Sequence, residues 1–322
     1  METVIGTSES NGPVKVRNPH IKSLSVDHLY HIALDTSDID KLESIFGDVK
    51  FVCFGGQPSR MEGFVKYINK ELGLDTHGPC PQNYAAGTDR YCVYKAGPVL
   101  SVSHGIGIPS LSIVFNEILK LMHYAKCRDV TFFRIGTCGG IGLEPGSVVL
   151  TEKAVDGEFS HFYKMFILGK RVERPAIVDE SLVQDLEACA REDDEFRTVR
   201  GITMCTEDFY ECQARLDGAF CDFNEQDKMA FMQTLKENNI CNIEMESLGF
   251  LALCRHAGIK GAVACVTLLD RLEQDYITVD IPKLKKWQVR AQTLILRYIK
   301  KKLGIECGLI PSLVYPQTIW CY

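Results

Sequence analysis

The sequence predicts an α/β protein built on a mostly parallel or mixed β-sheet that helices cover on both faces. Apolar runs rich in Val, Ile and Phe alternate along the chain with longer segments of helical period. These runs are nearly continuous, which is typical of strands buried on both faces. The chain has 322 residues, 46% of them hydrophobic, and this is enough apolar material for a substantial core.

The predicted strands share an apolar character and end in glycine, charged or turn residues. They are 49–56, a strand pair within 91–107 that turns at "AGP", 129–137, 146–155, 198–205 and 260–271. The predicted helices share an amphipathic period and lie at 60–73, 109–125, 180–192, 225–238, 245–257 and 282–303. Gly73 ends the first helix, and Pro109 stands in the first turn of the second, where its missing N–H costs nothing. In such sheets ligands gather at the carboxyl ends of strands, so a site is expected there.

We expect one central domain over residues 27–304, with a flexible N-terminal tail at 1–26 and a C-terminal tail at 305–322. The net charge is −6 and no long block of Lys or Arg occurs, so a nucleic-acid partner is not expected. The start of the chain lacks a signal-peptide pattern, and nothing approaches the ~18 unbroken apolar residues of a membrane span. We therefore expect a cytoplasmic protein with no membrane partner.

The 14 cysteines are scattered, and many lie in apolar strand or helix patterns. No C-x-x-C pair occurs, and the spacing of Cys205, Cys212 and Cys221 does not suit a zinc site. In a reducing compartment most of these cysteines are expected to be small buried apolar residues. The sequence therefore predicts no metal site.

Three predicted strand ends combine glycine with arginine. Gly55, Gly56 and Arg60 follow the first strand, Arg90 precedes another, and Arg134 ends the apolar run "VTFFR". Four glycines follow in "RIGTCGGIG", which we interpret as a turn. Glycine lets a backbone N–H approach an oxyanion closely, and arginine offers a fork to two of its oxygens. Three arginines at one small site would overcharge it without a dianion, so inorganic phosphate is predicted, although each arginine alone could pair with a surface carboxylate.

The stretch "NIEMES" places two carboxylates, Glu244 and Glu246, on either side of Met245 at a strand-to-helix junction. If Glu246 faces the site, its carboxylate can accept hydrogen bonds from a vicinal diol, and Met245 offers an apolar surface for a sugar ring. The alternative is that Glu246 caps the helix that follows.

The stretch "TEDFYECQARLD" carries Gln213 and Arg215 two residues apart, so in an extended segment they point the same way. A glutamine amide can donate and accept one hydrogen bond each at an imide edge, and an arginine can stabilise an enolate-like oxygen. Together they match the polar edge of a uracil ring, with Phe209 available for stacking. Taken alone, such a pair usually lies on the surface.

Together these stretches resemble the animal uridine phosphorylases of the nucleoside phosphorylase family, over roughly residues 27–304. The matching motifs, in order, are "FGGQPSRM", "AGTDRYC", "RIGTCGGIG", "MCTEDFYECQARLDGAFC", "NIEMES" and "VTLLDRL". The resemblance implies a three-layer α/β/α fold with a central mixed, partly barrel-like sheet. It further implies reversible cleavage of uridine by phosphate to uracil and ribose 1-phosphate, in pyrimidine salvage, with deoxyuridine as a further candidate substrate. It implies no cofactor, inorganic phosphate being a co-substrate.

The resemblance also implies which residues form the site. Phosphate would be held by Gly56, Arg60, Arg134 and Thr137, with Arg90 of the neighbouring subunit. Ribose would be held by Met245, Glu246 and Thr137, with His31 of the neighbouring subunit. Uracil would be held by Phe209, Gln213, Arg215, Gly139, Leu268 and Leu269, with Arg271 supporting Arg215 through water. Catalysis would depend on Arg134, Gln213, Arg215 and Glu246. Because each site takes residues from two chains, a homodimer is expected.

One residue departs from the family pattern, and alternatives remain open. Cys138 follows Thr137 where relatives commonly have a hydroxyl residue; a thiol is a weaker donor and can be oxidised, so a weakened uridine-binding paralogue is one alternative. A purine nucleoside phosphorylase would use Asp270 to protonate the base. A nicotinamide-dependent oxidoreductase would use "GIGIPS" at 105–110, which matches the dinucleotide fingerprint only in part.

Overall fold

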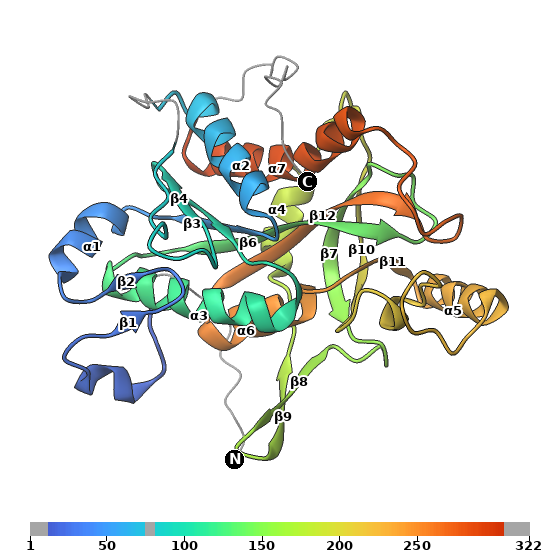
Figure 1. The fold of residues 1–322 in the computed structure, drawn as a ribbon. Coiled ribbons are helices and arrows are strands. Elements are labelled where there is room, and N and C mark those ends of the chain that lie inside the picture. Colours follow the sequence, from blue (N-terminus) through green and yellow to red (C-terminus); the bar gives the residue numbers. More distant parts are fainter. Residues whose placement is uncertain (1–11, 75–80, 306–322) are drawn as a thin grey trace.

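A mixed eight-stranded sheet runs through the molecule in the order β11-β10-β7-β12-β6-β3-β5-β4 (Figure 1). The computed structural model describes residues 12–74 and 81–305. The strands are β3 (Phe51–Gly55), β4 (Val93–Ala96), β5 (Val99–Ser103), β6 (Thr131–Gly140), β7 (Val148–Val155), β10 (Thr198–Cys205), β11 (Ile240–Glu244) and β12 (Lys260–Asp270). Five neighbouring pairs are parallel, while β4–β5, β7–β12 and β6–β11 are antiparallel. The predicted mixed sheet is confirmed.

The sheet closes partly on itself. Gly139 and Gly140 of β6 pair with Ile243 and Asn242 of β11, the strand at the far end of the sheet order. This pairing joins β6, β12, β7, β10 and β11 into a closed ring, so the partly barrel-like sheet is also confirmed. Closure brings β11 against the carboxyl end of β6, and this is where the site lies.

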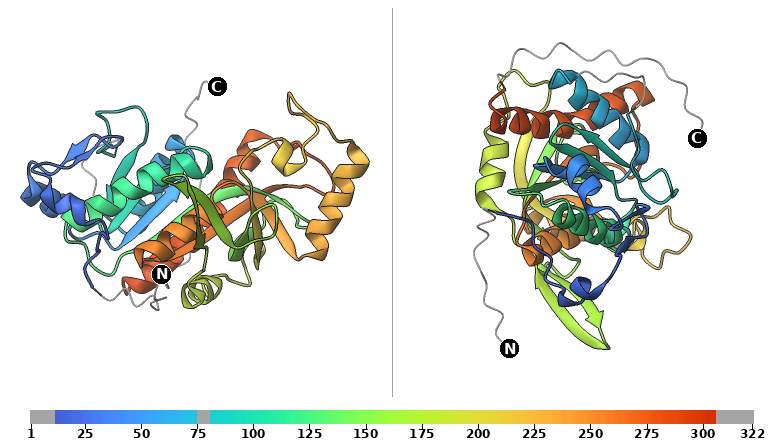
Figure 2. Two further views of the ribbon diagram at one scale, coloured as in Figure 1. Left: turned by 90° about the horizontal axis from the view of Figure 1, so that it is seen from below. Right: turned by 90° about the vertical axis from the view of Figure 1, so that its left-hand side faces the viewer.

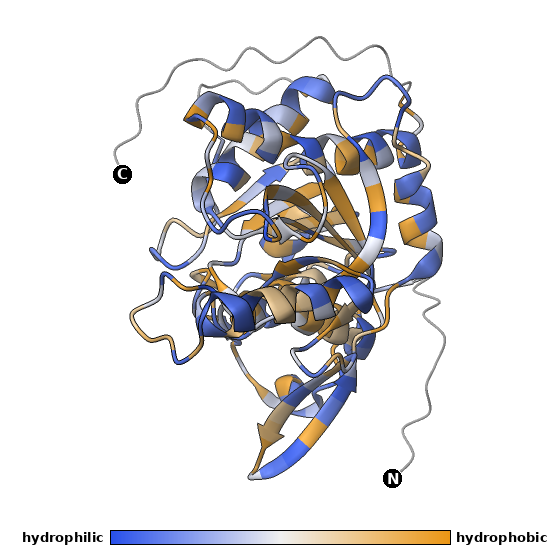
Figure 3. Cartoon of the chain, turned by 90° about the vertical axis from the view of Figure 1, so that its right-hand side faces the viewer, coloured by the Kyte–Doolittle hydropathy of each residue, from blue (hydrophilic) through white to orange (hydrophobic). Residues whose placement is uncertain are grey.

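Helices cover both faces of the sheet, as Figures 1 and 2 show. One layer consists of α2 (Pro58–Glu71), α4 (Glu180–Glu187) and α7 (Ile281–Lys302), and the other of α1 (Ile39–Phe46), α3 (Gly107–Tyr124) and α6 (Ser247–Ala257). An apolar cluster fills the space between the sheet and each layer, and Figure 3 shows apolar strands enclosed by helices with polar outer faces. The helix α5 (Glu225–Glu237) packs beside β11. The three-layer α/β/α prediction is confirmed.

Several segments differ from the prediction. The predicted turn after Arg134 is wrong, because β6 continues through the glycines to Gly140. An antiparallel hairpin of β8 (Phe162–Ile167) and β9 (Lys170–Pro175), which the sequence does not predict, projects from the body (Figure 1). Phe166 and Ile167 at the end of β8 are exposed, while Tyr163 packs against the apolar core. Short elements complete the chain: β1 (His28–Leu29), β2 (Leu34–Asp35), and 3-10 helices at Pro19–Ser23 and Glu211–Gln213.

Part of the predicted N-terminal tail is bound to the body. Val14 is buried, its N–H donates to the carbonyl of Cys127 at 2.9 Å, and its own carbonyl lies 2.9 Å from Nδ1 of His123 on α3. Residues 1–11, and the C-terminal tail beyond Ile305, lie outside the described residues. Within 12–74 and 81–305 no helix is both long enough and apolar enough to cross a membrane.

Candidate active site

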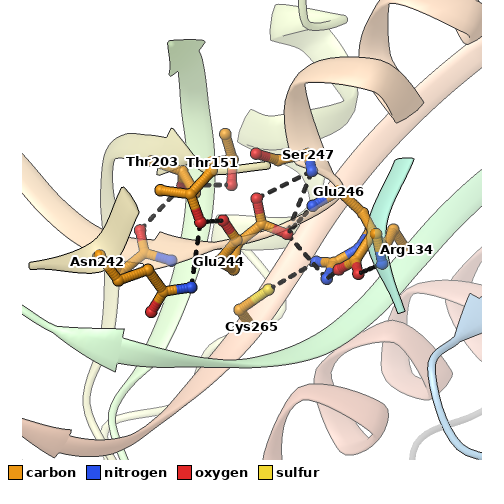
Figure 4. A network of polar contacts seen from close by, with 11 residues as sticks. Arg134, Thr151, Thr203, Asn242, Glu244, Glu246, Ser247 and Cys265 are labelled. Atoms are coloured by element: carbon orange, nitrogen blue, oxygen red, sulfur yellow. Dashed lines mark hydrogen bonds and ion pairs between the residues drawn. The ribbon is translucent and has the colours of Figure 1, made fainter. Parts of the chain in front are cut away.

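Arg134 is buried in the middle of β6 between two carboxylates (Figure 4). Its Nη2 contacts Glu246 and lies 2.8 Å from Oε2 of Glu244, and its Nη1 donates to Sγ of Cys265 at 3.1 Å. Burial would lower the pKa of Arg134, but the two glutamates outweigh it and raise this pKa well above its ordinary value. Arg134 is therefore already neutralised, so the overcharging predicted from converging arginines does not hold for it.

Two glycines of β6 make room for arginine side chains. A Cβ at Gly136 would lie 2.7 Å from Nη1 of Arg134 and 2.9 Å from Sγ of Cys265. A Cβ at Gly139 would lie 2.8 Å from Cγ of Arg271. No side chain fits at such distances without displacing its neighbour. These glycines are needed inside a strand for close packing, not to form a turn.

The two glutamates of the strand-to-helix junction have different partners. The carboxylate of Glu244 accepts the N–H groups of Glu246 and Ser247, each at 2.9 Å, at the start of α6. Glu246 occupies the position before α6, but its side chain makes no bond to that helix. Its Oε1 instead accepts the N–H of Gly107, the first residue of α3, at 2.5 Å. Glu244, not Glu246, thus takes the capping role proposed as the alternative.

Glu246 is held in its ionised form. Burial would raise the pKa of Glu246, but Arg134, His104 and the N–H of Gly107 together lower it below its ordinary value. The N–H of Gly107 belongs to the "GIGIPS" stretch. Because a protein carboxylate engages this N–H, the arrangement disfavours the dinucleotide-binding alternative.

Four buried nitrogen atoms beside this cluster have no hydrogen-bond partner among the described residues. They are Nε of Arg60, Nε of Arg134, and Nδ1 and Nε2 of His104. Burial first, and then Arg134, lowers the pKa of Arg60. A buried donor without a partner costs free energy, so this group of nitrogens fits an anionic acceptor. The sequence prediction missed His104, although its position directly after β5, in "SVSHG", matches the strand-end rule applied to the other residues.

The predicted uracil-binding residues lie on the other side of Glu244. The amide nitrogen of Gln213 donates to Oγ1 of Thr206 at 3.1 Å, and the N–H of Thr206 donates to the carbonyl of Glu244 at 2.9 Å. Nη2 of Arg271 donates to the carbonyl of Gln213 at 2.7 Å. Gln213 is thus buried and fixed through both its side chain and its backbone.

Arg215 is fixed by different groups. It donates to both carboxylate oxygens of Asp217, at 2.9 and 2.7 Å, and to the carbonyl of Asp275 at 2.8 Å. Its guanidinium lies 4.5 Å from the ring centre of Phe209. Arg271 binds the carboxylate of Asp275 at 2.6 Å. The two arginines are therefore linked directly through Asp275, where the sequence predicts a water link; this acidic residue was missed.

The reason given for pairing Gln213 with Arg215 is wrong. The segment is not extended: Glu211–Gln213 forms a 3-10 turn and Ala214 adopts a left-handed conformation, with φ of 51°. The two side chains are nevertheless both buried, because Arg271 and Asp275, in the segment directly after β12, bind this part of the chain. Local spacing identified the pair, but a distant segment positions it.

The remaining predicted residues lie on β6 and β12, or directly after β3 and β11. Gly56 follows β3, where a Cβ would lie 3.8 Å from Cε1 of His104. Thr137 is half-buried on β6, and Met245 is half-buried between the two glutamates. Leu269 of β12 pairs in register with Gly139, and Leu268 precedes it.

The last two predicted residues, His31 and Arg90, bind other partners within their own chain. His31 binds Glu117 of α3, with Nδ1 and Oε1 at 2.7 Å, and its side chain is 41% exposed. The side chain of Arg90 is 72% exposed, and its ion-pair contact is with Asp89 at 4.0 Å. The rings of His31 and Tyr91, the residue after Arg90, lie 6.4 Å apart. The two residues expected from a neighbouring subunit thus lie near each other on the surface.

Cys138 contacts the site indirectly. It lies on the same face of β6 as Arg134, because side chains alternate along a strand. Cys138 is buried, and burial first, then the thiol of Cys265, raises its pKa well above its ordinary value. Cys265 in turn accepts from Arg134. Cys138 is therefore linked to Arg134 through the thiol of Cys265.

Comparisons with known proteins agree with this geometry. The phosphorylase superfamily matches residues 50–300. The chain is 50% identical to uridine phosphorylase 1 of Mus musculus, over 90% of this chain and 93% of that protein. The structure of uridine phosphorylase from Schistosoma mansoni in complex with uracil is similar, with a TM-score of 0.84 and 37% identity over 90% of this chain and 100% of that one.

A more distant relative, inactive uridine phosphorylase B of Schistosoma mansoni, is 35% identical over 89% of this chain and 96% of that protein. Family membership therefore does not by itself establish that a chain turns over its substrate. The superfamily match, the identities and the shared fold all point the same way, and this chain belongs to the phosphorylase superfamily, among its animal-type uridine phosphorylases.

Proposed function

We propose that this protein is a uridine phosphorylase that cleaves uridine reversibly with inorganic phosphate, giving uracil and ribose 1-phosphate. The observation that carries the proposal is a group of buried nitrogens on Arg60, Arg134 and His104, beside an ionised Glu246, for which the described part of the chain offers no hydrogen-bond partner. Donors that lack a protein partner suit an oxyanion, and the neighbouring carboxylate suits the hydroxyl groups of a ribose. Gln213 and Arg215 supply polar groups for a base on the far side.

In the proposed reaction a phosphate oxygen attacks the anomeric carbon of the ribose. The C–N bond breaks, and its electron pair leaves with the uracil. Positive charge develops on the sugar, which the phosphate dianion stabilises, while the negative charge on the base is stabilised by Arg215 and Gln213. Because Arg271, Asp275 and Asp217 fix Arg215 and Gln213 beforehand, little reorganisation is needed at the transition state.

Other predicted contacts complete the proposed site. Gly56 and Thr137 would contact the phosphate, and Met245 the ribose. Gly139, Leu268 and Leu269 would enclose the uracil. Phe209 would line the site at its exposed edge, since its ring already lies against the guanidinium of Arg215. No metal or other cofactor takes part in the proposed reaction.

We also propose a homodimer in which His31 and Arg90 of one subunit complete the site of the other. The side chains of His31 and Arg90 are 41% and 72% exposed, they lie near each other, and within their own chain they bind Glu117 and Asp89. Tyr30 and Ile106, which are 75% and 77% exposed, add apolar surface next to His31 and next to the start of α3. For such a dimer we propose a cytoplasmic location.

The purine alternative is disfavoured by the position of Asp270. Its Oδ1 already accepts the N–H groups of Gly142 and Leu272, at 2.9 and 3.0 Å. This oxygen already holds the segments that follow β6 and β12, which leaves Asp270 a weak candidate for contacting a purine base.

The test is uracil release from uridine, followed by absorbance, with and without phosphate. We expect release that depends on phosphate, with inosine turned over far more slowly. Preferential turnover of inosine would overturn the assignment. Calorimetric binding of uridine without phosphate-dependent release would instead identify a non-catalytic uridine-binding paralogue. Gln213→Leu should lose discrimination between the bases, because a buried polar edge is then left unpaired.

A further inference from the structure

His104 is a buried imidazole surrounded by the charges of the site. It is 1% exposed, and neither ring nitrogen has a hydrogen-bond partner among the described residues. The charged groups that act on it are Glu246 from the start of α6, Arg134 from β6 and Arg60 from α2. Its backbone is held on both sides, since its N–H donates to Gly55 at 2.8 Å and its carbonyl accepts Oγ of Ser110 at 2.6 Å. The ring is thus fixed among the residues proposed to bind phosphate.

This imidazole is neutral at physiological pH. Burial lowers the pKa of His104 to about 4; Glu246 opposes this effect, and Arg134 and Arg60 add to it. A neutral imidazole carries one N–H donor and one nitrogen that accepts. Arginine, in contrast, only donates.

The dominant form of inorganic phosphate at neutral pH carries one hydroxyl proton as well as acceptor oxygens, whereas sulfate carries no proton. The arginines can donate hydrogen bonds to the acceptor oxygens of either anion, but they cannot accept a hydrogen bond from the hydroxyl group of phosphate. Both oxygens of Glu246 already accept hydrogen bonds from the protein, from Gly107 and Arg134, and in the proposed function its remaining acceptor positions bind the ribose hydroxyl groups. A neutral His104 can therefore donate to one phosphate oxygen and accept from the hydroxyl group.

We propose that His104 is a phosphate-binding residue that uses both ring nitrogens and makes the site select hydrogen phosphate over sulfate. The inference rests on the phosphate site of the proposed function. It adds a residue to that site and a basis for discriminating between two anions of similar shape and charge.

The first test is calorimetry of the full chain with inorganic phosphate alone and with sulfate alone, in the absence of uridine. We expect the unaltered protein to bind phosphate more tightly. His104→Leu should weaken phosphate binding about ten- to a hundredfold, as the loss of one or two buried hydrogen bonds implies, and weaken sulfate less. His104→Gln, which keeps a donor and an acceptor, should retain part of the preference. His123→Leu is the matched control, because His123 binds Val14 and not the site.

A second measurement needs no variant. In the unaltered protein the histidine that titrates near pH 4 is expected to be His104, and its ring resonances should shift when phosphate is added, with a smaller change for sulfate. A folded His104→Leu that binds phosphate within about twofold of the unaltered protein would overturn the inference. So would ring resonances that ignore phosphate while phosphate binds. Neither result would contradict phosphate-dependent release of uracil, so the role of His104 and the proposed function can fail separately.

Discussion

Arg134, Glu244 and Glu246 form a buried set of charges in which each member has a partner. Glu246→Gln keeps the size of the side chain and its ability to accept from Gly107, but removes the charge opposite Arg134. We expect kcat/KM for uridine to fall about 10- to 100-fold, the effect of losing a charge-assisted hydrogen bond. The free energy of unfolding should fall by about 1–3 kcal/mol, less than for a fully broken buried pair, because Glu244 still faces Arg134.

The same residue predicts a pH dependence. The pKa of Glu246 is lower in the folded protein than its ordinary value, so folding favours the ionised form. The stability from this source is present above the ordinary glutamate pKa of about 4.3 and is lost as pH falls through the lower folded value. The difference in unfolding free energy between the unaltered protein and Glu246→Gln should therefore shrink on acidification below pH ~5 in denaturant titrations. A difference that stays constant down to pH ~3 would contradict this account.

Cys138 is expected to matter less than its position beside Thr137 predicts. Cys138→Ser places a hydroxyl next to Asn242, whose side-chain nitrogen has no partner among the described residues and whose oxygen accepts from Thr203. The new hydroxyl can accept from that nitrogen, which offsets the cost of burying it. We expect kcat/KM to change less than about threefold, equivalent to under ~0.7 kcal/mol. A tenfold lower KM for phosphate in Cys138→Ser would instead show that the thiol weakens phosphate binding.

At the scale of single elements, β6 depends on glycine to admit two arginines. Gly136→Ala would force Nη1 of Arg134 and Sγ of Cys265 apart, since its Cβ would lie under 3 Å from each. We expect the free energy of unfolding to fall by about 1–3 kcal/mol, as in other overpacked cores, and kcat/KM to fall at least tenfold. Both are measured by denaturant unfolding and steady-state kinetics.

Gly63→Ala is the matched control for this substitution. Gly63 lies inside α2, and a Cβ there would meet nothing within 4 Å. Alanine should stabilise the helix by about 0.5–1 kcal/mol and leave kinetics unchanged. If both alanine variants behaved alike, close packing at Gly136 would not explain why glycine stands there.

Local pattern predicts the elements far better than it predicts their contacts. The helix predicted over 60–73 is found at Pro58–Glu71, and the one over 282–303 at Ile281–Lys302, because both carry an amphipathic period. The sequence predicts a turn at the glycines of β6 because the side chains that pack against them, those of Cys265 and Arg271, are more than a hundred residues away in the chain. The link from Asp275 to Arg215 was not predicted either, because these two residues lie 60 positions apart in the chain.

At the scale of the whole molecule, sheet closure creates the site. The pairing of β6 with β11 joins segments about a hundred residues apart, and it brings Arg134 to Glu244 and Glu246. The order of strands along the chain could not predict this pairing, whereas the resemblance to a known family implied a partly barrel-like sheet. Closure alone leaves His31 and Arg90 exposed on the same chain, and the proposed dimer would bring these two residues to the site of the partner.

A shared site predicts complementation between inactive variants. Arg90→Ala removes a residue given to the partner, while Arg134→Ala removes one kept by the chain, so each homodimer should lose most activity. A mixed dimer has one site carrying both changes and one site carrying neither. Random mixing makes half of the dimers mixed, so co-expression of the two variants with different affinity tags should restore about a quarter of the unaltered activity. The doubly tagged fraction should hold that activity. Equal activity in all fractions, or none in the mixed dimer, would mean that Arg90 does not act across the interface.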